Sequence, residues 1–196
     1  MLASIRDIIN PDVVINYDTS RNRLKLKEED ADSKVKELFI EHMPDSALAF
    51  TLDHQPKGNA RKYFKQLSLY VSSTNGTGVN KGCDLIILWQ EGDKKKALVF
   101  DLKSDKPSLQ ATQKQLDNSE LFLKYLLSMA SIHYGANVED IEINKAIVVT
   151  NTRGVNKRPT YRPNPSPPPI CFKVESVLPN PSRAASISFR QLVVSH

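Results

Sequence analysis

The sequence has few cysteines and no long apolar run. Its 196 residues include two cysteines, Cys83 and Cys171, which are too few and too far apart for a disulfide framework. No apolar stretch approaches the ~20 residues that a membrane helix needs, and the first residues do not form the apolar core of a signal peptide. These absences predict a reduced, cytoplasmic protein without a membrane segment.

Motifs for several common chemistries are also missing. The four histidines form no pair with metal-ligand spacing and no CxxC motif occurs, so we expect no structural zinc site. There is neither a P-loop nor a GxSxG motif. The glycines of GTGVNKG (76–82) precede an apolar strand rather than a helix. A nucleotide-binding fingerprint needs that helix, so we exclude it.

The composition is that of an ordinary globular domain. Hydrophobic residues make up 40% and charged residues 25% of the chain, and the length suits one domain spanning 1–196. The net charge of +5 is only a weak indication of an anionic partner. However, no Asp or Glu occurs at 54–83 or at 143–174, and both stretches contain several Lys and Arg residues.

The pattern of apolar residues predicts an α/β fold with a mixed central sheet flanked by helices and a β-rich C-terminal extension. The core would cover about 31–150, followed by a proline-rich basic loop at 151–169 and C-terminal strands within 170–196. Helices are expected at 3–9, 31–43 and 108–134, the last ending at Gly135. Strands are expected at 65–73, 83–90, 97–104, 146–150, 170–176 and 185–194, and we expect 83–90 and 97–104 to form a hairpin.

Charged residues interrupt the two apolar strands of this expected hairpin. Asp84 opens the first strand, and Asp101 and Lys103 lie near the end of the second, on one face of it. Pairing of the strands would bring Asp84 near Asp101. Two carboxylates and an ammonium at one sheet end suit phosphodiester hydrolysis, because carboxylates hold Mg²⁺ and Lys103 can act on the attacking water. The alternative is a buried Asp–Lys ion pair that braces the sheet.

These residues resemble the motifs of the PD-(D/E)xK nuclease superfamily, the fold of restriction endonucleases and many repair nucleases. The similarity extends over about 31–150 and lies in GCDLIIL and LVFDLKS followed by a helix. It implies an αβββαβ core and a Mg²⁺-dependent nuclease in which Mn²⁺ can substitute. Asp84, Asp101 and Lys103 would be catalytic, and Leu102 would join the two aspartates at the metal. Cys83 stands where the family often has proline.

The resemblance also implies supporting residues. Many members place a metal-binding Glu on the first helix, for which Glu37 and Glu41 are candidates. We prefer Glu41 as a catalytic and metal-binding residue because it lies nearer the apolar edge of the expected helix 31–43. Gln113 and Gln115 correspond to glutamines that follow the motif in some relatives. The alternative for all four is a solvated position on a helix surface.

The two acid-free stretches would bind the nucleic acid backbone on either side of the site. Candidate contacts are Lys57, Arg61, Lys62, Arg153, Lys157, Arg158 and Arg162. The alternative is that they only increase solubility.

The sequence therefore predicts a metal-dependent nuclease, most specifically a DNA endonuclease of restriction or defence type, with DNA favoured over RNA as its partner and a homodimer as one possible state. Two other hypotheses remain. One is a nucleic-acid-binding module that keeps the fold without cleaving. The other is an interaction protein that uses its proline-rich loop.

Overall fold

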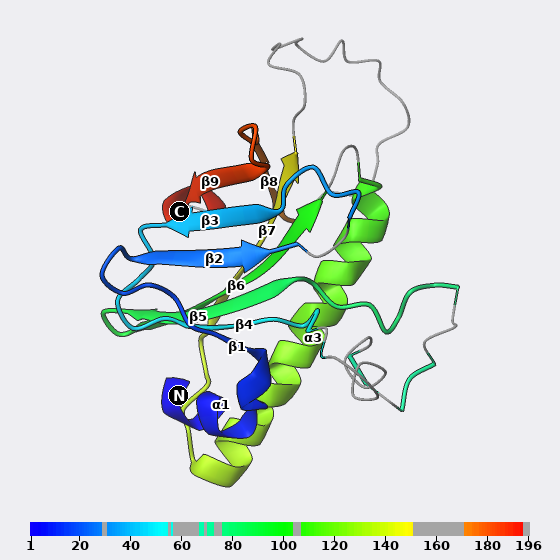
Figure 1. Ribbon diagram of the computed structural model, residues 1–196. Coiled ribbons are helices and arrows are strands. Elements are labelled where there is room, and N and C mark those ends of the chain that lie inside the picture. The colour runs from blue at the N-terminus through cyan, green and yellow to red at the C-terminus, as the bar shows by residue number, and fades with distance from the viewer. Residues whose placement is uncertain are drawn as a thin grey trace.

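A computed structural model describes residues 1–28, 31–54, 56, 67–68, 70–72, 76–103, 107–150 and 171–193. Within these ranges the chain forms a six-stranded and a three-stranded sheet with helices beside them (Figure 1). The expected α/β fold with a mixed sheet flanked by helices is confirmed. No helix in the described ranges is long and apolar enough to span a membrane.

The six-stranded sheet has the order β1-β4-β5-β6-β7-β8. In this sheet β1, β4, β5 and β6 pair antiparallel with their neighbours, whereas β6, β7 and β8 pair parallel. The strands are β1 (Val14–Ile15), β4 (Leu48–Phe50), β5 (Leu85–Glu91), β6 (Lys94–Lys103), β7 (Glu142–Thr150) and β8 (Lys173–Val177). The expected hairpin is thus β5–β6, with a turn at Gly92 whose φ is positive.

A second sheet lies over one face of the first. Its order is β2-β3-β9, comprising β2 (Arg23–Lys27), β3 (Glu37–Glu41) and β9 (Ala184–Ser188). The other face is covered by α1 (Leu2–Ile8) and by α3 (Leu109–Tyr134), which runs beside the sheet (Figure 1). Two short helices complete the described elements, the 3-10 helix η1 (Pro11–Val13) and α4 (Phe189–Leu192).

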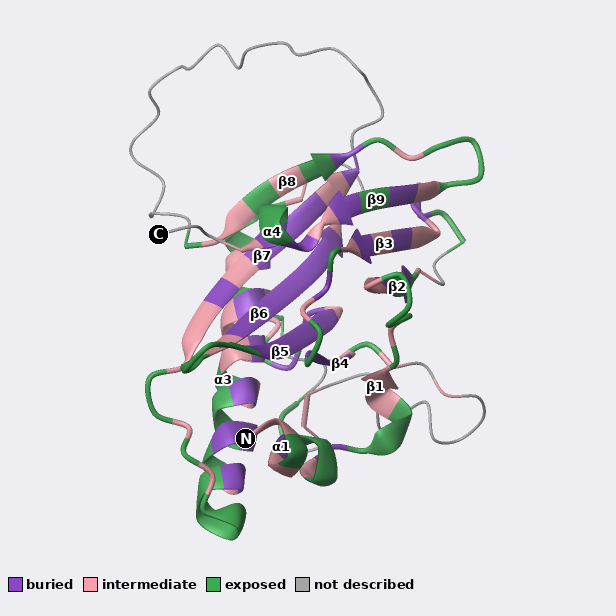
Figure 2. Ribbon diagram, turned by 90° about the vertical axis from the view of Figure 1, so that its left-hand side faces the viewer, coloured by how far each residue is buried: buried purple, intermediate pink, exposed green. Residues whose placement is uncertain are grey.

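The main sheet is buried on both faces, which explains the continuous apolar runs in its central strands (Figure 2). Alternate residues of β5 and β6 divide between two cores. Leu85 and Phe100 pack toward the small sheet, whereas Ile86 and Val99 pack toward α1 and α3. Because side chains alternate along a strand, Asp101 and Lys103 face α3, on the same side as Val99.

The expected helix at 31–43 is wrong. Residues 37–41 form β3, which pairs with β2 and β9 in the small sheet. Leu38 and Ile40 are fully buried, whereas the alternating residues Glu37, Phe39 and Glu41 are partly exposed. Burial therefore repeats every two residues, as in a strand. Helical spacing of other apolar residues in this range was coincidental, and packing against a sheet distant in sequence decides the conformation.

Two further predicted strands need correction. Of the expected strand 65–73, the described residues 67–68 and 70–72 are not in a strand, and the others lie outside the described ranges. The expected strand 185–194 ends at Ser188, where α4 begins. Ser188 and Gln191 form a capping box, in which the Ser188 N–H donates to Gln191 Oε1 at 3.1 Å. This short capping motif lies inside an otherwise strand-like sequence.

Candidate metal and catalytic site

The register of the β5–β6 hairpin brings Asp84 and Asp101 together. Leu85 pairs with Phe100 in the antiparallel ladder, so the next position along places Asp84 opposite Asp101. Asp84 is held there by the backbone of the facing strand, since the Leu102 N–H donates to Asp84 Oδ2 at 2.7 Å. Like charges directly opposite each other destabilise a sheet. The pair therefore requires a compensating positive charge.

Asp101 is completely buried and its charge is only partly compensated. The Lys103 ammonium forms an ion pair with its Oδ2. Apart from this ion pair and the facing Asp84, whose backbone and side chain favour the ionised form of Asp101, no described residue donates a hydrogen bond to either oxygen. A buried carboxylate normally accepts several hydrogen bonds, and leaving it with few is costly.

The electrostatics of the pair follow from this burial. Burial raises the pKa of Asp84 well above its usual value, and the nearby Asp101 carboxylate raises it further. Burial also raises the pKa of Asp101, although the Lys103 ammonium opposes that change. With both aspartates ionised, the two carboxylates and Lys103 carry a net charge of −1. A bound cation would stabilise the ionised form of both groups.

Gln115 of α3 holds Lys103 in position. Its Oε1 accepts a hydrogen bond from Lys103 Nζ at 2.9 Å, and its Nε2 donates to the Gly82 carbonyl. The same side chain thus links the lysine of β6 to the segment that leads into Asp84. The sequence predicted a supporting role for Gln115, and the structure places it against Lys103.

Other residues of α3 fix the segment before β5. The Cys83 N–H donates to Ser119 Oγ at 2.8 Å, and Ser119 in turn donates to the Gln115 carbonyl at 2.9 Å. Burial raises the pKa of the Cys83 thiol to about 12, so it remains protonated at neutral pH and acts as a buried apolar group. The positioning role of Ser119 was missed in the sequence, because a serine inside a helix has no pattern that signals it.

Gly82 allows the close approach that this arrangement needs. A Cβ at this position would lie 2.8 Å from the Leu67 side chain and 3.1 Å from Leu52 Cβ. A larger residue would require the Leu67 side chain to move and the contact with Leu52 to relax, two residues before Asp84. The glycine is therefore part of the site's scaffold.

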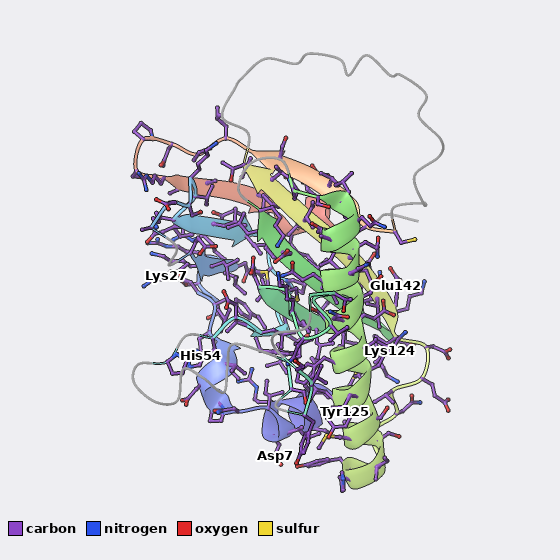
Figure 3. All side chains as sticks on the ribbon, turned by 90° about the vertical axis from the view of Figure 1, so that its right-hand side faces the viewer. Asp7, Lys27, His54, Lys124, Tyr125 and Glu142 are labelled. Atoms are coloured by element: carbon purple, nitrogen blue, oxygen red, sulfur yellow. The ribbon has the colours of Figure 1, made fainter. Side chains whose placement is uncertain are left out.

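A cavity of about 440 Å³ opens beside Asp84 and Leu102. It lies between the main sheet and β2, and Lys25, Lys27 and His54 also line it. Figure 3 shows Lys27 and His54 on the same side of the molecule, away from Lys124 and Glu142. The volume of this cavity is in the range of ligand-binding clefts.

The donor set suits a magnesium ion held by few protein ligands. Asp84 and Asp101 supply carboxylate oxygens, and Leu102 can contribute only its carbonyl oxygen. No group of three or more His, Cys, Asp or Glu in the described ranges is arranged to hold a metal. Mg²⁺ is commonly bound through one or two carboxylates, with water and substrate phosphate completing the shell. The under-compensated Asp101 fits such an ion.

Glu37 and Glu41 are not brought to this cluster. Both lie on β3, on the face opposite the buried Leu38 and Ile40, and the reason for preferring Glu41 disappears with the expected helix. Lys25 Nζ forms an ion pair with Glu37 Oε1 at 2.5 Å, and Arg23 pairs with Glu41 at 3.9 Å. These contacts stabilise the β2–β3 pairing.

Gln113 is also away from the cluster. It donates to Asp117 Oδ1 at 2.8 Å and accepts from the Cys171 N–H at 3.0 Å, so it ties α3 to the segment before β8. The predicted nucleic-acid contacts all lie outside the described residues, as does the proline-rich loop. They are Lys57, Arg61, Lys62, Arg153, Lys157, Arg158 and Arg162.

The chain was compared with known proteins in three ways. It matches no protein-family model, no curated protein and no solved structure.

Proposed function

We propose that the protein is a Mg²⁺-dependent nuclease that hydrolyses phosphodiester bonds, most specifically a DNA endonuclease of restriction or defence type. One observation carries this proposal. A fully buried Asp101 lies opposite Asp84 with Lys103 as its charge partner, and beyond these two residues no described residue donates a hydrogen bond to its oxygens. An ion pair that only braces the sheet would need further hydrogen bonds to the carboxylate, because these offset the cost of removing the two charges from water.

The arrangement of the central elements supports the same assignment. The resemblance to PD-(D/E)xK nucleases implies an αβββαβ core. Strands β4, β5 and β6 form an antiparallel meander, and α3 then connects β6 to the parallel neighbour β7. The expected core spans about 31–150 with its first helix at 31–43; since that range begins with β3, the helix of this assignment would instead be α1 (Leu2–Ile8), outside the expected range. Its acidic residue Asp7 accepts a hydrogen bond from the Tyr134 hydroxyl, so no helix carboxylate is assigned to the metal.

Each residue of the cluster then has a role. Asp84, Asp101 and the Leu102 carbonyl would hold Mg²⁺, which when bound would supply Lewis-acid polarisation of the scissile phosphate and activation of water. Lys103 orients the attacking water and compensates the negative charge that develops on the phosphate. Gln115 keeps the Lys103 ammonium at this place. Without a metal, burial and the facing Asp101 raise the pKa of Asp84, and a bound cation would oppose that change.

A cleavage assay tests the proposal. Purified protein is incubated with plasmid, linear duplex, single-stranded DNA and RNA, with Mg²⁺, Mn²⁺ or EDTA. We expect DNA to be cut with either metal and not with EDTA. Asp101→Asn removes the charge with little change in volume and should abolish cleavage while DNA binding persists. A matched control is Asp117→Asn, a carboxylate on α3 that contacts Lys145 instead, and it should still cut.

The competing hypothesis is a module that binds nucleic acid without cleaving it. Binding by the wild type with no cutting of any substrate under either metal would favour that module and overturn the nuclease. Cutting that survives Asp101→Asn would also overturn it, because the activity would then come from elsewhere. Cleavage of RNA but not DNA would support the nuclease function and contradict the proposal that DNA is the substrate.

A further inference from the structure

A second cavity lies on the other side of the Asp84–Asp101–Lys103 cluster. It has a volume of about 400 Å³ and is formed by the turn at 76–81 and the first turns of α3. We call it the lysine cavity. Its lining residues are Gly76, Thr77, Gly78, Lys81, Ser108, Gln110, Ala111, Lys114 and Gln115.

The lysine cavity concentrates positive charge. Lys81 and Lys114 line it, and among the described residues that line it there is no acid. Both lysines are exposed, and neither has an ion-pair partner in the part of the chain that the structure describes. In contrast, the cavity beside Asp84 is also lined by Glu28 and Asp53. An anion bound in this cavity would be attracted by both ammonium groups.

The position of Lys81 is fixed by the fold. Asn118 of α3 donates from Nδ2 to the carbonyls of Gly78 and Lys81, at 3.0 and 3.3 Å. The aliphatic stem of Lys81 packs over Gly78, whose φ of 75° closes the turn. Lys114 lies four residues before Asn118, on the same face of the helix. Asn118 thus fixes the backbone at Lys81 against the helix face that carries Lys114, and both side chains line the same cavity.

The lysine cavity adjoins the proposed catalytic residues. Gln115 lines it, and the same side chain accepts the hydrogen bond from Lys103 Nζ. A group bound between Lys81 and Lys114 would thus lie on the Lys103 side of the cluster, whereas the other cavity lies on the Asp84 and Leu102 side. The cluster is located between the two.

We propose that the lysine cavity binds a backbone phosphate of the nucleic acid strand next to the one that is cleaved. This rests on the proposed nuclease function for the identity of the strand. Lys81 and Lys114 supply the positive charge, and the Ser108 hydroxyl can donate a hydrogen bond to a phosphate oxygen. The contact is to the backbone, so it adds affinity and positioning without reading the sequence.

Binding of a fluorescent oligonucleotide in EDTA, measured by anisotropy over a series of salt concentrations, tests this. Lys81→Ala/Lys114→Ala should weaken binding roughly tenfold at 0.1 M salt and reduce the slope of log K against log salt by about 1 to 2. Lys81→Arg/Lys114→Arg should restore both. The matched control is Lys94→Ala/Lys95→Ala at the opposite end of the β5–β6 hairpin, which should change neither.

Competition identifies the bound group. Inorganic phosphate and a nucleoside 5′-monophosphate should each displace the oligonucleotide from wild type more effectively than from the double alanine variant. An unchanged salt slope in that variant, or equal effects in the control pair, would overturn the inference. Preferential binding of the free phosphate compounds, with no loss of oligonucleotide affinity in the variant, would also overturn it.

The two proposals fail separately in these experiments. If the wild type never cuts but the lysine variants change the salt slope as stated, the nuclease is wrong and the phosphate site stands. If Mg²⁺-dependent cutting is observed and the salt slope is unaffected, the nuclease stands and this site is wrong.

Discussion

Two charged clusters lie on the same face of the main sheet, against the same helix, and they differ in how well their charges are balanced. In the first, Asp84, Asp101 and Lys103 leave a net charge of −1 when both aspartates are ionised. In the second, Lys145 of β7 contacts Asp117 and Glu120 of α3, both at 2.5 Å. Glu120 also pairs with Lys124, so the second cluster is neutral.

The pKa values of the acids show what the difference means. Burial raises the pKa of Asp84 and of Asp101, and their surroundings do not reverse the change. Burial also raises the pKa of Glu120, but hydrogen bonds from Lys124 and Lys145 outweigh this effect and lower it. The Lys145 cluster is therefore satisfied as it stands and serves the fold. The Asp84–Asp101–Lys103 cluster costs stability, which is typical of a site whose charge is completed by a ligand.

Replacing each of the two lysines, Lys103 and Lys145, with methionine should give the largest difference in cleavage rate between the clusters. Lys103→Met should lower the rate of Mg²⁺-dependent cleavage by about 10²–10³-fold, as expected when a group that stabilises developing charge is lost. Lys145→Met should leave the rate near wild type while lowering the melting temperature, because Asp117 loses its ion-pair partner and Glu120 keeps only Lys124. Single-turnover cleavage and thermal melts measure both. Equal losses of rate would mean that both clusters are only structural.

The two glutamines of α3 provide a smaller contrast. Gln115→Leu should reduce the cleavage rate roughly tenfold, because Lys103 loses a hydrogen bond worth on the order of 1 kcal/mol that orients it. Gln113→Leu, two residues away, should leave the rate unchanged, since its partners are Asp117 and the Cys171 N–H. A KM change without a kcat change in Gln115→Leu would contradict its role in positioning Lys103.

Neutralising Asp84 should stabilise the metal-free protein. Because its pKa is raised, wild type loses stability as pH rises from the unfolded pKa toward the folded one, whereas Asp84→Asn does not. The variant should gain on the order of 1 kcal/mol in unfolding free energy at pH 7, and little at pH 4. Urea denaturation in EDTA at several pH values measures this. If Asp84→Asn were less stable than wild type at pH 7, the hypothesis that the Asp84 charge is uncompensated would be wrong.

Neutralising Glu120 should lower the unfolding free energy, the opposite of the Asp84 variant, and this change should be the smallest of the four. Its pKa is lowered, so its carboxylate stabilises the fold above the unfolded pKa, and that contribution disappears as pH falls through the folded pKa. Glu120→Gln should lose less than about 1 kcal/mol at pH 7, because the group is partly exposed to water. The same denaturation series shows whether the difference from wild type vanishes near pH 3.

The sequence predicted the hairpin and its charged residues because two strands close in sequence have a short turn and few alternative registers. Asp84, Asp101 and Lys103 stand out as charges inside apolar runs, and that contrast is visible without a structure. The residues 37–41 were misassigned because their partners, β2 and β9, include a strand more than 140 residues away. Glu41 was then assigned to the site on a helical face that does not exist.

The amino-acid sequence by itself determined the chemical groups of the candidate site and the strands that carry them, because burial of an apolar hairpin depends on a local alternation of side chains. The tertiary structure alone decided which groups support it. Gln115 rather than Gln113 contacts Lys103, Ser119 holds the Cys83 N–H, and Asn118 holds the carbonyls of Gly78 and Lys81. The contacts of Gln115 with Gly82, of Ser119 and of Asn118 join α3 to segments 33 to 40 residues before it. They depend on how the helix packs on the sheet, which no local pattern specifies.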